Sequence, residues 1–444
     1  MEKLVINGGK RLKGTISVSG AKNVALKTLV AACLTDEEVI IENVPLISDF
    51  MVMVSIIRSL GGAVKINDHT AYIQVKKLKL KKISLEESAK IRTSAMLVAP
   101  MLGRLGEAII PNPGGCRIGA RPIDRTIEGL KAMGAETSYN SDDGYFYIRS
   151  NGLEKKRTIS YRFSKSTHTG TETLIMAAVL LPKKTVLENA AEEPEIDELI
   201  AILNKMGAKI ERVKKRTIVI NGVEKLRGAR FKIGSDRNEI VTFAAAAIVT
   251  RGDVFIRNAN NIDLKSFLEK LKKARAGYEI KKNGIRFYYR DPLKSTDIQT
   301  GIYPGFMTDW QGPWSILMTQ ADGVSTVHET VYENRFGYVK ELKKMGADVS
   351  LFNPKIENPS KTYNFNLRDD SKEYYHALKV YGPTKLHNAV VEISDLRAGA
   401  TLVLAALLAP LKSTIFGVEH LDRGYEKFEE RLNSLGASIK RVKH

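Results

Sequence analysis

The 444-residue sequence contains only two cysteines, two tryptophans and no long hydrophobic run. Two cysteines cannot form a disulfide framework, and such scarcity is typical of proteins from a reducing compartment. The longest uncharged run, residues 398–411, is too short to cross a bilayer as a helix. The first residues include no apolar stretch of the kind found in secretory signals. We therefore expect a cytoplasmic protein that does not bind membranes.

The charge of the chain is strongly unbalanced. Its 69 lysines and arginines against 50 acidic residues give a net charge of +19, which suggests an anionic partner. A phosphorylated small molecule and a nucleic acid are both candidates. Because neither zinc-finger spacing nor an aromatic-rich strand for base stacking is present, we expect no specific nucleic-acid binding. The seven histidines show no metal-ligand spacing, so no metal site is predicted.

A short signature recurs along the chain, consisting of Leu or Met, then glycine, then alanine. Each copy follows an amphipathic stretch and precedes a strand-like segment, as expected for a helix, a glycine C-cap and a strand. Counted from Gly62, the first three glycines are 72 and 73 residues apart. The copies lie at residues 60–63, 133–135, 206–208, 345–347 and 435–437, with a degenerate copy at 274–277.

A second series of helices runs in register with the first. Its six members, mostly rich in Ala and Leu, begin near Lys22, Arg92, Gly170, Asn238, Asp309 and Asp395. Residues 241–249 and 401–408 are apolar nearly all round, so these helices should be buried. The sequence predicts an α/β fold of two bundles, each with three repeats, in which buried helices lie inside and sheets outside.

Polar residues gather at the starts of these buried helices. Capping explains the Ser, Thr and Asp residues there. It does not explain Lys22, Arg92, Arg237 and Arg397, because cations are disfavoured at the positive end of a helix dipole. Cations at these ends are expected if an anion binds there as well.

Cys116 lies in a glycine-rich segment, residues 113–122. The glycines allow close approach to a ligand, while Arg117 and Arg121 favour a thiolate and attract an anion. We predict a reactive side chain, and the alternative is an inert cysteine in a surface loop. Cys33 lies in a mostly apolar run and is expected in the core.

Together these features resemble the enolpyruvyl transferase family over nearly the whole chain. The resemblance implies two inverted α/β barrel domains, one of residues 22–233 and one of residues 1–21 with 234–444. The matching segments are 19–23, 113–124, 189–195, 303–309, 329–336, 395–397 and 422–426.

The resemblance implies a reaction as well as a fold. Enolpyruvate would pass from phosphoenolpyruvate to the 3-hydroxyl of UDP-N-acetylglucosamine with release of phosphate, the first committed step of peptidoglycan synthesis. Cys116 matches the proton donor, Asp309 matches the residue that can take the hydroxyl proton, and Lys22 and Arg397 match cations for phosphoenolpyruvate. We expect a monomer that needs no cofactor. Further positions matched to substrate contacts are Asn23, Arg92, Arg121, Pro122, Ile123, Asp124, Arg125, Lys165, Val331, Arg335, Asp395 and Arg423.

Two alternatives stay open. One is transfer to 3-phosphoshikimate, although the family branch with that acceptor lacks a reagent cysteine in this loop. The other is a non-catalytic protein that binds anions or nucleic acid on the same repeat. From the residues alone, Val331 is favoured as a residue in the core of a strand. Residues 355–380 are expected to be a polar surface insertion.

The surroundings of Cys116 generate a testable prediction. Arg117 and Arg121 favour the thiolate, yet a proton donor must hold its proton. Bound phosphoenolpyruvate should partly neutralise these cations and favour the thiol. The pH midpoint for alkylation of Cys116, followed by intact mass, should therefore move upward when phosphoenolpyruvate is present. An unchanged midpoint would contradict this prediction.

Overall fold

The structure, a computed structural model, describes residues 2–114, 119–120, 122–150, 158–259 and 264–443. The chain divides into two compact units. Unit 1 contains Met1–Ser19, Cys116–Arg121 and Ser235–His444, and unit 2 contains Gly20–Gly115 and Pro122–Gly234. Each unit is therefore built from more than one stretch of sequence, and unit 1 takes its first strands from the N-terminal end of the chain.

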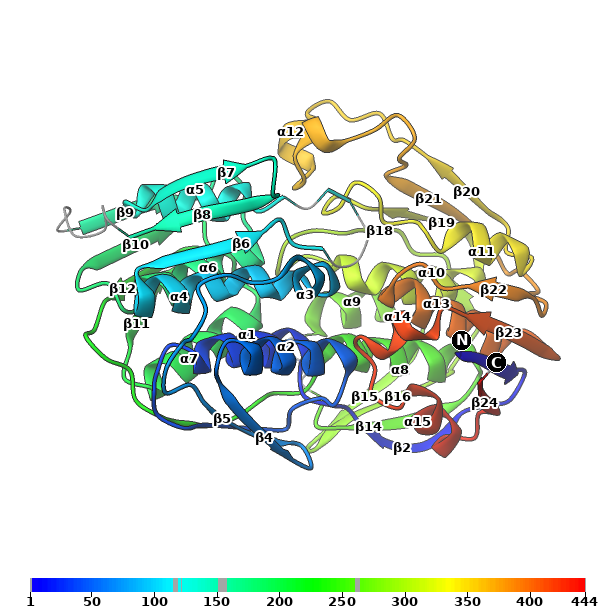
Figure 1. Cartoon of the computed structure of the whole chain (residues 1–444). Coiled ribbons are helices and arrows are strands. Elements are labelled where there is room, and N and C mark those ends of the chain that lie inside the picture. The colour runs from blue at the N-terminus through cyan, green and yellow to red at the C-terminus, as the bar shows by residue number, and fades with distance from the viewer. Residues whose placement is uncertain (1, 115–118, 121, 151–157, 260–263, 444) are drawn as a thin grey trace. The chain divides into compact units, whose positions relative to one another are not determined.

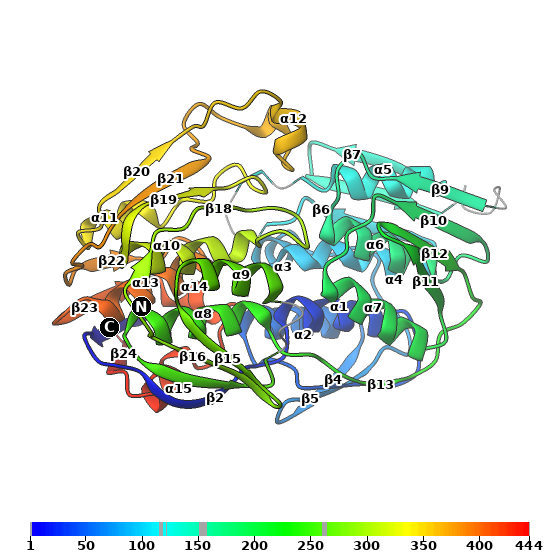
Figure 2. The same cartoon turned by 180° about the vertical axis from the view of Figure 1, so that it is seen from behind.

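The described residues form six small sheets, three in each unit (Figures 1 and 2). In unit 2 the strand orders are β13 (Arg230–Lys232)-β3 (Val39–Glu42)-β5 (Thr70–Gln74)-β4 (Ala63–Asn67), β6 (Glu107–Pro111)-β8 (Tyr145–Arg149)-β7 (Glu136–Asn140), and β11 (Lys209–Lys214)-β12 (Thr217–Asn221)-β10 (Lys184–Glu188)-β9 (Thr158–Arg162). In unit 1 they are β15 (Gly277–Lys281)-β16 (Gly284–Tyr288)-β14 (Asp253–Arg257)-β2 (Lys13–Ser17), β17 (Leu293–Lys294)-β19 (Ala321–His328)-β21 (Ala377–Gly382)-β20 (Val349–Phe352) with β18 (Ile298–Gln299) beside β19, and β22 (Val390–Glu392)-β23 (Lys412–Phe416)-β1 (Glu2–Asn7)-β24 (Ile439–Lys443).

The sheets share one topology. A parallel edge strand is followed by two antiparallel pairings, as in β2, β14, β16 and β15. In the sheet of β6, an isolated parallel bridge between Lys82 and Ile109 takes the place of the edge strand. Edge strands can come from distant parts of the chain, since β13 pairs with β3 and β2 pairs with β14. Each unit is thus closed by a strand remote in sequence.

The predicted buried helices form the interior of each unit. In unit 1, α8, α10 and α13 contact one another, and all of α8 is buried. A helix that is apolar all round has no face suited to water, so it is stable only inside such a shell. The predicted fold class, with helices inside and sheets outside, is confirmed. The inner helices are α1 (Lys22–Ala32), η1 (Arg92–Leu97) leading into α4 (Val98–Leu105), α6 (His168–Ala178), α8 (Arg237–Val249), η3 (Thr308–Trp310) leading into α10 (Gln311–Thr319), and α13 (Leu396–Leu408).

The amphipathic helices of the repeat end on a left-handed residue. Gly61, Gly134 and Gly207 have φ values of +97°, +100° and +101°. The repeat is therefore counted from Gly61 and not from Gly62, which makes both intervals 73 residues. In the degenerate copy, Arg275 takes this position at φ +61°. The amphipathic helices are α2 (Ser48–Ser59), α5 (Asp124–Ala132), α7 (Pro194–Lys205), α9 (Lys265–Lys273), α11 (Val339–Lys344) and α15 (Phe428–Ser434), and the remaining short helices are α3 (Leu85–Lys90), α12 (Pro359–Thr362), η4 (Leu367–Asp369) and α14 (Val418–Asp422).

The expected polar insertion at 355–380 needs a correction. Its last residues belong to β21, which pairs with both β19 and β20 inside the sheet. Before that strand, Tyr363, Phe365 and His376 are buried. The Tyr363 ring lies 4.9 Å from both the Phe365 ring and the His376 ring. The polar composition of the segment concealed this small aromatic core.

The left-handed conformation of Arg275 provides a stability test. An L-residue in this region costs about 1–2 kcal/mol, partly offset by the greater unfolded-state entropy of glycine. Arg275 is exposed, so little packing is at stake. Arg275→Gly should raise the free energy of unfolding in urea by up to about 1 kcal/mol.

Gly207→Ala is the matched control. An added Cβ there meets no atom within 4 Å, so only the backbone conformation opposes the change. It should lower the free energy of unfolding by about 1 kcal/mol. A loss of stability in both variants would contradict the explanation for Arg275.

Candidate active site

Four predicted site residues of unit 1 form one cluster of carboxylates and guanidinium groups. Asp309 Oδ1 lies 2.7 Å from Arg335 Nη2, and Asp309 Oδ2 lies 3.2 Å from Arg397 Nη2. Asp395 Oδ1 lies 3.4 Å from Arg335 Nη1. The side chain of Asp309 is 22% exposed, whereas that of Arg335 is 4% exposed and that of Arg397 is 9% exposed. Asp309 is therefore the member most open to a ligand.

The start of α13 explains how Arg397 is held. Asp395 is the N-cap, and its Oδ1 accepts hydrogen bonds from the Arg397 and Ala398 amides at 3.0 and 3.2 Å. The capping interpretation thus accounts for Asp395. The Arg397 guanidinium donates to the Tyr425 hydroxyl at 3.0 Å as well as to Asp309. A buried cation at the positive end of a helix requires such partners, and sequence reasoning did not identify Tyr425.

The surroundings of Arg335 indicate a supporting role. It is nearly inaccessible to solvent and bridges the carboxylates of Asp309 and Asp395. Its guanidinium thereby fixes the orientation of Asp309. Contact between Arg335 and substrate stays a prediction.

Val331 and Arg423 lie in different local environments. Val331 follows the end of β19 and is half-buried in a loop, so the alternative of a strand-core residue is wrong. Its amide donates to Glu329 Oε1 at 2.8 Å. Arg423 is half-buried at the end of α14. Their contacts with substrate stay predictions.

In unit 2, Lys22 is the first residue of α1. Its Nζ lies 2.7 Å from Asp49 Oδ2 on α2, and the two side chains are 11% and 7% exposed. Asn23, the next residue of α1, is half-buried. Asp49 was missed because an acidic residue in the first turn of an amphipathic helix is ordinarily explained by the helix dipole.

The second predicted group of unit 2 contains Arg92 and residues 122–125. Arg92 begins η1, and its Nη2 donates to the Pro122 carbonyl at 3.1 Å. Pro122 is exposed, Ile123 is buried and Asp124 begins α5. The contact brings two segments together that the sequence connected only through the resemblance.

Arg125 and Lys165 are close enough to repel each other. Partial burial first, and then the charge of Arg125, lower the pKa of Lys165. Tyr161 Oη donates to the Arg125 carbonyl at 3.2 Å, which ties β9 to the start of α5. A bound polyanion would relieve this repulsion, as expected for groups that contact a diphosphate.

A buried charged cluster of unit 2 was not predicted. Glu172 is fully buried on α6, and its carboxylate lies 3.2 Å from Lys27 Nζ and 3.2 Å from His168 Nε2. Burial is the largest single influence and lowers the pKa of His168, but the charge of Glu172, the hydrogen bond to Glu172 and the charge of Glu193 together hold this pKa above the ordinary histidine value. The signal in the sequence was a charged residue, Lys27 or Glu172, in the middle of each of two helices that were expected to be buried.

The loop that carries the predicted proton donor is described only in part. Cys116, Arg117 and Arg121 lie outside the described residues, so their roles stay predictions. The Ala120 amide donates to Glu333 Oε1 at 2.5 Å. Gly119 has φ +140°, and an added Cβ would lie 2.3 Å from Glu333 Oε1, so only glycine fits there.

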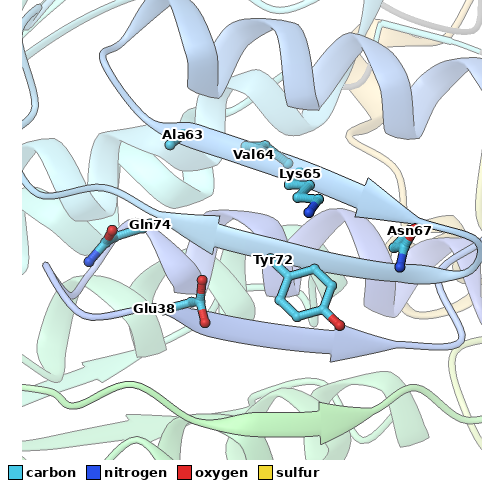
Figure 3. A pocket seen from close by; sticks show the side chains of 7 residues that line it. All are labelled: Glu38, Ala63, Val64, Lys65, Asn67, Tyr72 and Gln74. Atoms are coloured by element: carbon cyan, nitrogen blue, oxygen red, sulfur yellow. The ribbon is translucent and has the colours of Figure 1, made fainter.

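A hollow of about 490 Å³ lies on the sheet of β13, β3, β5 and β4 in unit 2 (Figure 3). Figure 3 shows side chains of β4 and β5, among them Lys65 and Tyr72, with Glu38 beside the start of β3. None of the predicted site residues lines it. This hollow therefore plays no part in the candidate site.

In the described part of the chain, no group of three or more His, Cys, Asp or Glu side chains is placed to hold a metal ion. Among the same residues, no helix has both the length and the apolar character needed to cross a membrane.

Known structures define the class to which this architecture belongs. The enolpyruvyl transferase NikO from Streptomyces tendae superposes with a TM-score of 0.86 over 100% of this chain and 99% of its own, at 22% identity. EPSP synthase from Acinetobacter baumannii superposes with a TM-score of 0.72 over 100% of both chains, at 17% identity. The fold is that of the enolpyruvyl transferases.

Sequence comparison then identifies the family. The profile of the family described as EPSP synthase (3-phosphoshikimate 1-carboxyvinyltransferase) matches residues 6–432, and the chain belongs to this family. UDP-N-acetylglucosamine 1-carboxyvinyltransferase from Koribacter versatilis (strain Ellin345) is 41% identical over 100% of this chain and 97% of its own length. The protein of the same name from Bartonella tribocorum (strain CIP 105476 / IBS 506) is 39% identical over 100% of both chains.

The charged cluster of unit 1 predicts a stability difference between two aspartates. Asp309→Asn removes a carboxylate shared by two buried guanidinium groups and should lower the free energy of unfolding by about 2–3 kcal/mol. Asp253→Asn is the control, because Asp253 pairs with Arg286 at 2.6 Å where the side chains are 40% and 37% exposed. It should lower the free energy by less than about 1 kcal/mol. Equal losses in urea unfolding would contradict the assignment of Asp309 as a shared partner.

Proposed function

We propose that this chain transfers the enolpyruvyl group of phosphoenolpyruvate to the 3-hydroxyl of UDP-N-acetylglucosamine and releases phosphate. The observation that carries the proposal is the full-length similarity, at 39–41% identity, to relatives named for a carboxyvinyl transfer to this nucleotide sugar. The cluster around Asp309 supports the proposal, because it holds a carboxylate that could accept a proton beside guanidinium groups that attract an anion. The presence of Cys116, expected for this acceptor and not for 3-phosphoshikimate, supports the same choice.

Phosphoenolpyruvate carries a phosphate and a carboxylate, so cations must converge on it. Lys22 and Arg397 are proposed for this role, assisted by Arg92 and Arg121. Lys22 and Arg397 lie at the N-terminal ends of inner helices, where the helix dipole adds to the attraction of an anion. Lys22 is paired with Asp49 and Arg397 with Asp309. Each carboxylate compensates the charge of the buried cation before substrate binds.

The addition step needs a base and an acid. Asp309 accepts the proton of the sugar hydroxyl while that oxygen attacks C2 of phosphoenolpyruvate, and Cys116 donates a proton to the methylene carbon. The product of this step is a tetrahedral intermediate that still carries the phosphate. Loss of a proton from the new methyl group and departure of phosphate then restore the double bond. Arg335 supports the first step by holding Asp309 at 2.7 Å.

The diphosphate of the nucleotide sugar is assigned to Arg125 and Lys165. Burial first, and then the charge of Arg125, lower the pKa of Lys165, and the repulsion between the two cations favours a polyanion beside them. The backbone of residues 122–124, to which Arg92 donates, is proposed for the uridine. Asn23, Val331, Asp395 and Arg423 complete the proposed substrate contacts.

The biological setting follows from this reaction. We propose a cytoplasmic enzyme that catalyses the first committed step of peptidoglycan synthesis and thereby supports cell shape and division. It should act as a monomer without a cofactor. The epoxide fosfomycin should inactivate it by alkylating Cys116.

The deciding experiment measures phosphate release from phosphoenolpyruvate with UDP-N-acetylglucosamine, in parallel with 3-phosphoshikimate. Release is expected with the nucleotide sugar alone. Intact mass after fosfomycin treatment should show one adduct in the wild type and none in Cys116→Ala. Asp309→Asn should reduce kcat by about 100-fold or more, because the hydroxyl loses its proton acceptor.

Other outcomes would change the proposal in defined ways. Release with 3-phosphoshikimate alone would keep the transfer chemistry but overturn the acceptor. No release of phosphate with either acceptor would overturn the proposed transferase activity and favour a binding role. Full activity without a fosfomycin adduct would contradict the assignment of Cys116.

A further inference from the structure

We infer that Glu329 is a positioning residue for the acceptor, because its buried carboxylate joins the turn that carries Asp309 to the turn that carries Val331. The inference rests on the proposed function, in which Asp309 takes the hydroxyl proton and Val331 contacts the sugar. Glu329 lies at the end of β19 and is fully buried. It touches neither substrate nor reacting atoms in this assignment and acts through its neighbours.

Three hydrogen bonds define the junction. Thr308 Oγ1 donates to Glu329 Oε2 at 2.8 Å, immediately before Asp309 in the chain. The amides of Val331 and Tyr332 donate to Glu329 Oε1 at 2.8 and 3.1 Å. One carboxylate thereby fixes both turns, and neither turn is part of a helix longer than η3 or of a strand.

The backbone around Glu329 is held independently of its side chain. Its amide donates to the His376 carbonyl at 2.8 Å. The next residue, Thr330, donates from Oγ1 to the Thr300 carbonyl at 2.7 Å and receives the Asn364 amide at its own carbonyl. Removing the carboxylate should therefore release the two turns while leaving the strand end in place.

The charge of Glu329 and its hydrogen-bond geometry can be separated by mutation. Burial raises the pKa of Glu329, and the Arg335 charge together with the hydrogen bonds from Val331 and Thr308 partly offsets this. Glutamine has the shape of the protonated acid: its oxygen can accept both amides and its amide can donate to the Thr308 hydroxyl. Alanine can do neither. If Glu329 positions the two turns through hydrogen bonds, Glu329→Gln should keep the activity that Glu329→Ala loses.

The experiment compares Glu329→Ala and Glu329→Gln with the wild type by steady-state kinetics with UDP-N-acetylglucosamine. Glu329→Ala should raise the acceptor KM about tenfold and lower kcat about tenfold, because small misplacements of reacting groups have effects of this size. Glu329→Gln should stay within about threefold of the wild type in both constants. Unchanged constants in Glu329→Ala, or a Glu329→Gln variant as impaired as Glu329→Ala, would overturn the inference.

Glu341→Ala is the matched control for loss of a buried carboxylate. Glu341 is 9% exposed on α11 and accepts the Glu392 amide at 3.2 Å, but it is not among the proposed site residues. It should lose stability while keeping the acceptor KM and kcat within about twofold. If Glu341→Ala shifts both constants as much as Glu329→Ala does, the effect is one of general stability and the inference fails.

A readout without turnover separates this inference from the proposed function. Hydrogen exchange of the Val331 and Tyr332 amides in the free protein should accelerate at least about tenfold in Glu329→Ala and stay near the wild-type rate in Glu329→Gln. If the wild-type protein releases no phosphate with the nucleotide sugar, the proposed function is overturned. The exchange rates would still decide whether Glu329 holds the two turns, and unchanged rates in Glu329→Ala would refute it.

Thr308→Val is the substitute test of the inference if Glu329→Ala does not fold. It removes only the hydroxyl that reaches Glu329 Oε2 and leaves the bonds to Val331 and Tyr332. It should lower kcat about threefold or more while the acceptor KM changes less than twofold, because only the turn of Asp309 is released. Wild-type kinetics in this variant would overturn the link to Asp309.

Discussion

In both units a cation stands at the N-terminal end of a buried inner helix and is held by a carboxylate from another element. Lys22 pairs with Asp49, and Arg397 pairs with Asp309. The helix dipole opposes these cations, and burial makes an isolated charge more costly still. The pairs therefore restrict how the surrounding helices can pack. They also place cations where an anionic substrate is expected to bind, and each cation could then contact the substrate as well as its protein carboxylate.

Other buried carboxylates connect the inner helices to their surroundings. Glu172 joins α6 to Lys27 of α1. Glu239 on α8 accepts the Arg431 guanidinium at 2.8 Å, and burial is the main influence raising the pKa of Glu239. Removing either partner of such a pair leaves an uncompensated charge, so each pair strongly favours one arrangement of its helices. The arrangement of the helices sets the positions of the proposed site residues. Glu329 and Glu333 hold neighbouring loop segments through hydrogen bonds.

The repeat provides the framework on which these charges are set. Small residues in α8 and α13 allow close contact between inner helices, and the sheets bury their remaining surfaces. Edge strands drawn from remote sequence, such as β2 and β13, close the two units. Several of the proposed site residues lie at the starts of inner helices, where backbone amides without a partner inside the helix can attract an anion.

The repeat, the six inner helices and the unusual cations at their starts could be predicted from the sequence, because periodicity and local charge are properties of short stretches of chain. The sequence also marked Asp309, Arg335 and Arg397 as site residues through the family resemblance. That Asp309 bridges those two arginines, which are 26 and 88 residues away from it, could be seen only in the folded chain. The partners Asp49, Glu172 and Glu329 and the pairing of β21 also required the tertiary structure. Such contacts depend on how distant segments pack, and a buried carboxylate has no local sequence pattern that names its partner.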